Sequence, residues 1–232
     1  MKKHFIISAR RIIDLHFNLL ALSLATLVLT VGIGCNEKVS PESKAHVAQE
    51  HLDKAVSLLE QKKWDSAISE LSEAIQIDDK SDATYVKRAK AYYEKNDYGN
   101  AIADCTKAIQ INANSFEAFN QRGLAYLGTG IDKGRAIKDF TIAINLNPDP
   151  DAYEPYIQLC LTYVWYDIDK AIDTIDQAIA KINHRRTKAM LYSVRAKMYS
   201  VKGDRTKAMA DLQAADRLGI NPESVWRAFG WL

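Results

Sequence analysis

The fold of this chain is decided by residues 119–143, which read FNQRGLAYLGTGIDKGRAIKDFTIA. Ala136 and Ala143 lie seven residues apart on one face of a predicted helix, and Phe140 between them continues the apolar stripe on that face. Gly123 belongs to a preceding predicted helix and lets the two helices approach closely, as ridge-into-groove packing requires. The stretch therefore predicts a pair of amphipathic helices that pack against each other.

The same arrangement recurs at nearly constant intervals. The alanine pairs are Ala67/Ala74, Ala101/Ala108, Ala136/Ala143, Ala171/Ala178 and Ala208/Ala215, and successive pairs are 34, 35, 35 and 37 residues apart. The small residues that precede them are Ala55, Ala89, Gly123, Cys160 and Ala196. A fixed period of this length is typical of helix-turn-helix arrays, in which each unit buries its apolar face against its neighbours. We therefore predict an all-α fold.

The run Phe119–Tyr126, followed by Ala136-Ile137 and by Asn145–Pro148, resembles the tetratricopeptide repeat (TPR). Similar segments are Lys95–Ile102 and Lys202–Ala208. The resemblance implies a right-handed helical solenoid of about five units over residues 46–220. The expected units are 48–81, 82–115, 116–151, 152–187 and 188–220.

Two units depart from the pattern. Unit three has one extra residue in its inner turn, within residues 128–134, so its second helix is expected to begin late. Unit four lacks a glycine turn between Trp165 and Lys170 and carries Pro155 near its start. A proline fits the first turn of a helix, where its missing N–H would lack a partner anyway. Unit four is therefore interpreted as a degenerate repeat.

Residues 221–232 begin with Asn221 and Pro222, a combination that starts a helix. Val225, Trp226, Phe229 and Trp231 would then cover the open end of unit five, because a terminal repeat has no neighbour on its outer face. We predict a C-terminal capping helix. An exposed aromatic patch that mediates dimerisation is the alternative.

Residues 1–34 have the organisation of an export signal, with four basic residues before an uncharged apolar run from Leu19 to Gly34. The end of this run, Gly32–Cys35, resembles the lipobox of bacterial lipoproteins, and the resemblance implies that Cys35 receives a lipid. Residues 35–45 are then predicted to be a polar, flexible tether.

An uncleaved signal anchor is the alternative for this segment. Sixteen apolar residues form a helix of about 24 Å, which is short for a hydrocarbon core of about 30 Å. Basic residues on the amino-terminal side keep that end in the cytoplasm in either case. Both interpretations place the repeats on the periplasmic or extracellular side of a bacterial cell envelope, anchored to the membrane.

The charge balance argues against nucleic-acid binding. The chain has 31 basic and 29 acidic side chains, and residues 1–34 contain four of the basic and one of the acidic ones. The remainder is therefore close to neutral, with 27 basic and 28 acidic side chains. A nucleic-acid-binding domain would show a basic excess.

The sequence offers no catalytic constellation, metal-binding spacing or phosphate-binding glycine loop. His46 and His51 are five residues apart, which does not place them on one helix face. Cys105 and Cys160 occupy repeat positions that face the helix interface, where cysteine behaves as a small apolar residue. We expect both to be buried, and we expect no enzyme activity, cofactor or metal.

In TPR folds the first helix of each unit lines a concave groove. The resemblance places these partner-binding candidates there: Val86, Lys90, Tyr93, Asn120, Leu124, Leu127, Ile157, Leu161 and Lys197. Most are apolar, which favours an amphipathic helix or an apolar extended segment as the ligand. A one-residue error in register would move several of them into the inter-helix core, and this alternative stays open.

Two further features limit the choice of partner. Some relatives hold a terminal carboxylate through lysine and asparagine, but unit one has Leu52 and Val56 at those positions. Arg88, Arg122 and Arg195 recur at one repeat position, where arginine is expected to bond within the scaffold.

The predicted function is a membrane-tethered scaffold or adaptor that binds a partner peptide or helix in its groove, in envelope assembly or localisation. The alternative is a structural subunit of a stable membrane-associated complex, anchored by an uncleaved transmembrane helix. The partner is a protein or peptide in both cases. The sequence leaves the oligomeric state and the choice of membrane open.

Overall fold

A computed structural model describes residues 41–147, 149, 152–164 and 166–228, and within these ranges the chain contains α-helices and no strand. The helices are α2 (Pro41–Glu60), α3 (Trp64–Ile77), α4 (Asp82–Glu94), α5 (Tyr98–Ile111), α6 (Phe116–Gly128), α7 (Lys133–Leu146), α8 (Glu154–Tyr163), α9 (Ile168–Lys181), α10 (Arg185–Lys202), α11 (Arg205–Arg217) and α12 (Pro222–Ala228). The predicted export segment, Cys35, Phe229 and Trp231 lie outside the described residues.

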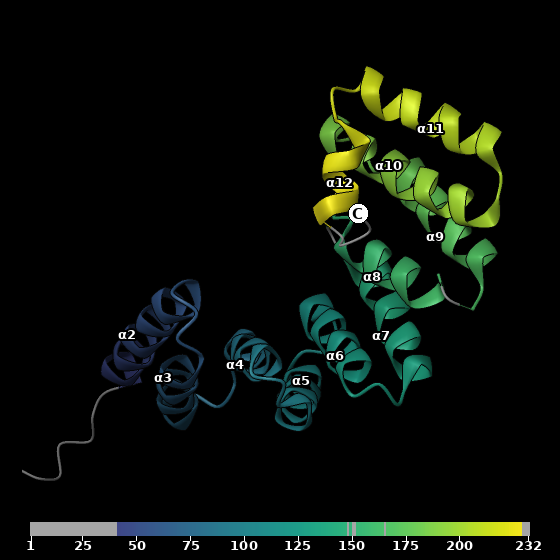
Figure 1. The fold of residues 1–232 in the computed structure, drawn as a ribbon. Coiled ribbons are helices and arrows are strands. Elements are labelled where there is room, and N and C mark those ends of the chain that lie inside the picture. The colour runs from purple at the N-terminus through teal and green to yellow at the C-terminus, as the bar shows by residue number, and fades with distance from the viewer. Residues whose placement is uncertain (1–40, 148, 150–151, 165, 229–232) are drawn as a thin grey trace, which may run out of the picture. The chain divides into compact units, whose positions relative to one another are not determined.

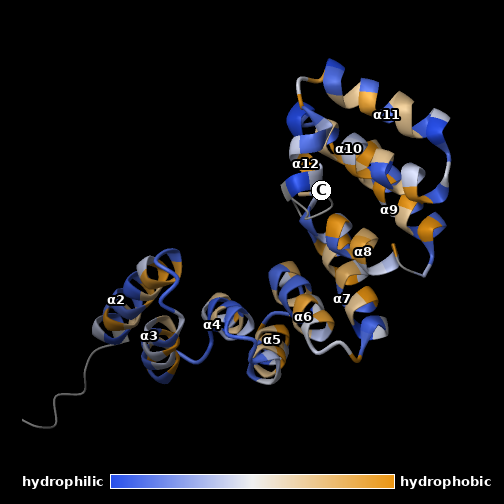
Figure 2. Cartoon of the chain, in the orientation of Figure 1, coloured by the Kyte–Doolittle hydropathy of each residue, from blue (hydrophilic) through white to orange (hydrophobic). Residues whose placement is uncertain are grey.

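Residues 45–232 form one compact unit built of helix pairs (Figure 1). Each helix from α3 to α11 packs against the next one along the chain, and α4 also contacts α6. The pairs α2–α3, α4–α5, α6–α7, α8–α9 and α10–α11 correspond to the five predicted units. Figure 2 shows that the helices carry both hydrophilic and hydrophobic segments. The helical-solenoid prediction is confirmed.

The recurring small residues lie in the buried interfaces between helices. All five alanine pairs are buried, and so are the small residues on the preceding helices. A Cβ atom added to Gly123 would lie 2.7 Å from Cε1 of Phe140, so only glycine fits opposite this ring. In unit two the smaller Cys105 packs in a cluster with Ala89, which has a Cβ atom. Residue sizes at the two positions are therefore matched between the helices.

Aspartate starts the second helix of four units. Asp97, Asp132, Asp167 and Asp204 each accept a hydrogen bond from the backbone N–H three residues later. This bond satisfies one of the helix-terminal donors that have no partner inside the helix. In unit one, Lys63 occupies the same position and provides no side-chain cap.

The recurring arginines bond within the scaffold, as expected. Arg88 donates to both carboxylate oxygens of Asp104 at 2.8 Å and to Ser72 Oγ at 3.0 Å. It thereby joins α4 to α5 of its own unit and to α3 of the preceding one. Arg122 forms the same bidentate pair with Asp139. Such forked pairs fix helix orientation as well as adding energy.

Arg195 in unit five pairs with Asp211 and also with Asp176 of unit four. These hydrogen bonds, above all those that Arg195 donates to Asp211, raise the pKa of the Arg195 guanidinium. Unit four has no equivalent pair, because Leu159 and Thr174 occupy the two positions, and both are buried.

The predicted departures of units three and four are present. The inner turn of unit three runs from residue 129 to 132, one residue longer than the turn 95–97 of unit two. In unit four, Pro155 lies in the first turn of α8, which has only 10 residues.

α2 begins at Pro41, so residues 41–45 of the predicted tether belong to this helix, and residues 35–40 lie outside the described residues. Proline has the backbone conformation of a first helical turn. None of the described helices is long and apolar enough to cross a membrane.

Candidate protein-binding surface

The predicted groove residues lie on the first helices of units two to five. We use the term inner face for the side of these helices that carries the predicted groove positions. Its residues are Val86, Lys90 and Tyr93 on α4, Asn120, Leu124 and Leu127 on α6, Ile157 and Leu161 on α8, and Ser193 and Lys197 on α10. Most of the apolar members are half-buried and pack on the helix core through part of their surface. They therefore combine a structural contact with an exposed part that a partner can reach.

Units two and three contribute the more open part of the inner face. The Leu124 and Leu127 side chains pack on the cluster around Phe140 and stay half-exposed. Lys90 is exposed and adds a positive charge beside this apolar surface. The Tyr93 ring lies 5.6 Å from the Tyr98 ring of α5, centroid to centroid, and burial raises the pKa of Tyr93.

Asn120 is a polar interruption of this surface. Its Oδ1 atom is buried and has no hydrogen-bond partner among the described residues. A buried amide oxygen without a partner costs free energy. Asn120 is therefore the inner-face residue with an unused hydrogen-bond acceptor.

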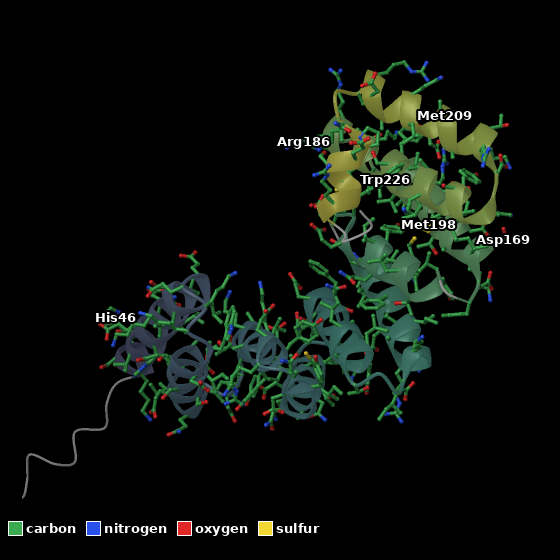
Figure 3. All side chains as sticks on the ribbon, in the orientation of Figure 1. His46, Asp169, Arg186, Met198, Met209 and Trp226 are labelled. Atoms are coloured by element: carbon green, nitrogen blue, oxygen red, sulfur yellow. The ribbon has the colours of Figure 1, made fainter. Side chains whose placement is uncertain are left out.

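Units four and five are less open. Ile157 is only 3% exposed and belongs to the core cluster with Tyr156 and Leu191, so it offers a partner little surface. The alternative that some groove candidates belong to the inter-helix core therefore applies to Ile157. Lys197 lies 5.3 Å from the centre of the Trp226 ring, which comes from α12 (Figure 3).

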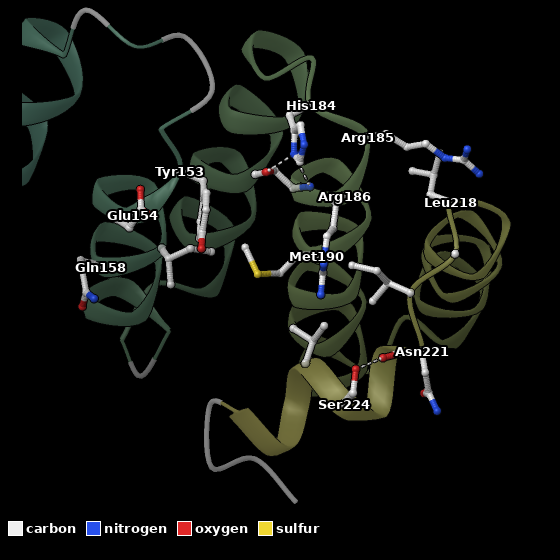
Figure 4. Close-up of a pocket in the computed structure, with 15 residues that line it drawn as sticks. Tyr153, Glu154, Gln158, His184, Arg185, Arg186, Met190, Leu218, Asn221 and Ser224 are labelled. Atoms are coloured by element: carbon white, nitrogen blue, oxygen red, sulfur yellow. Dashed lines mark hydrogen bonds between the residues drawn. The ribbon is translucent and has the colours of Figure 1, made fainter.

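A pocket of about 1170 Å³ lies between α8, α10 and the segment that leads into α12 (Figure 4). Its apolar lining includes Tyr153, Ile157, Met190 and Ile220. Figure 4 shows Arg186 beside Met190 on α10. The pocket continues the inner face past unit four. It was not predicted from the sequence, because one of its walls is formed by α12 and the loop before it, which lie outside the repeat pattern.

The C-terminal helix α12 is present, and it packs mainly on α10. Trp226 Nε1 donates a hydrogen bond to the backbone oxygen of Ser193 at 2.7 Å, and Val225 is buried in the core cluster of units four and five. These contacts are with the inner face of α10, and α11 is contacted less. The α11 residue Met209 is 55% exposed (Figure 3). The capping role stays a prediction.

The histidines in the described part of the chain have structural partners. His51 Nδ1 lies 2.6 Å from Glu70 Oε2, His46 pairs with Glu50, and His184 starts α10 by accepting from the Thr187 N–H. No group of three metal-binding side chains occurs in the part of the chain that the structure describes.

Cys105 and Cys160 are free thiols and fully buried, as predicted. Loss of hydration raises the pKa of each thiol to about 12. Both therefore stay protonated at neutral pH, and a protonated thiol is a poor nucleophile.

Comparisons with known proteins identify the repeat and the fold. The family model described as TPR repeat matches residues 89–130. The comparison with curated proteins finds no match. The crystal structure of the MamA protein is 23% identical to this chain, with a TM-score of 0.60, and the match covers 74% of this chain and 91% of that one.

Two other solved structures extend this result. A thermophilic TPR protein of Thermus thermophilus has a TM-score of 0.58 at 17% identity, and the match covers 79% of this chain and 97% of that one. The second TPR domain of the human RPAP3 protein, solved with an HSP70 peptide, has a TM-score of 0.47 at 25% identity and covers 53% of this chain and 98% of its own. The MamA and Thermus likenesses, with the helix order, establish an all-α solenoid of TPR type.

Proposed function

We propose that this TPR-type chain is a membrane-tethered adaptor that holds a segment of a partner protein on its inner face. The TPR fold is a protein-interaction scaffold. The observation that carries the proposal is the series of half-buried apolar side chains on successive inner helices, namely Val86, Tyr93, Leu124, Leu127 and Leu161. Apolar anchors at this spacing suit an amphipathic helix or an apolar extended segment.

The exposed charge on the inner face gives the ligand an orientation. Lys90 is exposed and attracts a carboxylate. The partner segment is therefore apolar on one side and carries an acidic group beside that side.

The tether rests on the sequence of residues 1–45. An export signal that ends at Cys35 would deliver the repeats across a bacterial membrane and attach a lipid to them. Confinement to a membrane raises the effective concentration of the domain for a partner in the same envelope. Recruitment of that partner is then the mechanism, in envelope assembly or localisation.

The intact mass of the membrane-extracted protein tests the tether. The expected result is loss of residues 1–34 with a mass gain of the size of a lipid, and Cys35→Ser should abolish both changes. If the chain is unprocessed and the substitution does not change its mass beyond the exchanged residue, the lipid tether is contradicted and a membrane-spanning anchor takes its place in the proposal. Mild crosslinking in the envelope fraction tests the adaptor role, and failure to recover any envelope protein would contradict it.

A further inference from the structure

The inner face of unit five is occupied by the chain itself. The indole of Trp226 donates to the Ser193 carbonyl oxygen at 2.7 Å, and the Lys197 ammonium group lies over the same ring at 5.3 Å. Val225, one residue earlier, is 8% exposed and packs in the core cluster. Ser193 and Lys197 are inner-face positions, so α12 lies where a ligand of unit five would lie.

The sequence of α10 makes room for this indole. The position of Ser193 is filled by Leu52, Val86, Asn120 and Ile157 in units one to four, all with larger side chains. Ser193 is 0% exposed, and its hydroxyl group donates to the Ala189 carbonyl oxygen, along its own helix. A larger side chain here would stand between the indole and the backbone. The small residue therefore forms a notch that fits an indole ring.

The attachment of α12 is small. The helix has seven residues, and a helix this short is not stable without tertiary contacts. Ser224 and Arg227 are exposed, so Val225 and Trp226 provide its anchors among the described residues. Gly219, two residues before Asn221, has a φ of +87°, which only glycine adopts without strain. A pocket lies beside α12, and Ser224 and Val225 form part of its lining.

We propose that α12 is a displaceable internal ligand, which covers the inner face of unit five until a partner helix with an apolar–indole pair replaces it. This inference rests on the proposed adaptor function. It states that a partner must displace α12 before it can bind the inner face of unit five. The occupant of the resting site is this chain's own Val225-Trp226 segment. Displacement would couple partner binding to release of α12.

A peptide in trans tests this proposal without a partner protein or a membrane. A fluorescent peptide of residues 219–232 is titrated onto the full chain and onto a chain that ends at Ile220, and binding is followed by anisotropy. The truncated chain should bind the peptide at least tenfold more tightly, since the attached helix competes at high effective concentration in the full chain. A peptide with alanine in place of Trp226 should lose this binding, and so should the truncated chain with Ser193→Leu.

A folded truncated chain that does not bind the peptide would overturn the proposal, and so would equal binding of the alanine peptide. Circular dichroism establishes whether the truncated chain is folded. If it is not, the comparison moves to the full chain with Trp226→Ala, which should bind the peptide at least tenfold more tightly than the unaltered full chain. Equal binding by these two chains would also overturn the proposal. Neither result bears on partner binding at units two and three, so the adaptor function is tested separately.

Discussion

Gly123 on α6 and Phe140 on α7 are fitted to each other so closely that a Cβ atom on Gly123 would lie 2.7 Å from the Phe140 ring. The ring is fully buried. Gly123→Ala should therefore destabilise the protein, since overpacking costs about 1–3 kcal/mol and exceeds the gain of about 1 kcal/mol from the better helix former. Urea unfolding measures the change.

The matched control for this prediction is Phe140→Leu. The shorter side chain removes the clash, so Gly123→Ala should become stabilising in this background by up to about 1 kcal/mol. The sign of the alanine effect would then depend on residue 140 alone. An alanine effect of the same sign in both backgrounds would contradict the steric argument.

A second prediction concerns the ion pair between Arg122 and Asp139, whose carboxylate accepts at 2.7 and 2.9 Å. Asp139→Thr should destabilise the protein by about 3 kcal/mol, because it leaves a half-buried guanidinium without its carboxylate. The double variant Arg122→Leu/Asp139→Thr copies Leu159 and Thr174 of unit four and should be more stable than Asp139→Thr. If the double variant is less stable than both single variants, a leucine–threonine pair like that of unit four cannot replace the ion pair in unit three.

A third prediction uses the aspartate caps. Asp97→Ala removes the acceptor for the Asn100 N–H and should cost about 1 kcal/mol. Lys63 occupies the equivalent place in unit one without a side-chain cap, so Lys63→Asp should stabilise the protein by about 0.5–1 kcal/mol. Thermal unfolding of the two variants should shift in opposite directions, and a shift in the same direction would contradict a capping role.

The cap of α9 predicts a pH dependence. The Lys170 backbone N–H lowers the pKa of Asp167 by its hydrogen bond, and the Lys170 side chain adds to the effect. A carboxylate with a lowered folded pKa stabilises the fold above the unfolded value of about 3.9, and this stabilisation is lost as the pH falls through the folded pKa. NMR titration should give a midpoint for Asp167 below the ordinary aspartate value.

Asp167→Asn provides the control for this titration. Asparagine also caps helices but does not titrate in this range, so the variant should lose less stability than the unaltered protein between pH 5 and pH 2. A titration midpoint for Asp167 at or above the ordinary value would contradict the hydrogen-bonded cap.

A fifth prediction concerns the two buried thiols. Burial raises the pKa of Cys105 and Cys160 to about 12, and neither side chain is exposed. In a Cys35→Ser variant, neither thiol should react with Ellman's reagent while the protein is folded, and both should react in guanidinium chloride. Rapid reaction in the native state would show an accessible thiol, and no reaction after unfolding would show a disulfide.

The array could be predicted because each unit packs against its neighbours in sequence. The spacing of the alanine pairs places Cys105 and Cys160 in the helix interface, and the recurrence of arginine at one position indicates a scaffold role. The carboxylate partners were missed, although Asp104, Asp139 and Asp211 each follow the first alanine of a pair by three residues. That recurrence was the available signal.

The site of α12 could not be read from the repeat period. It depends on a hydrogen bond from the Trp226 indole to the backbone oxygen of Ser193, 33 residues earlier in the chain. We infer that the small Ser193 side chain leaves room for this indole. The start of α2 was also not predicted. The helix begins at Pro41, within a stretch whose polar composition favoured a tether.

The central claim is that the inner face binds a partner protein in the envelope. A photo-crosslinking amino acid placed at Lys90, which is exposed on the inner face, is compared in the membrane fraction with the same group at Met209 on α11. The proposed function predicts a discrete protein adduct from position 90 and none from position 209. Adducts of equal yield from both positions, or from position 209 alone, would contradict it.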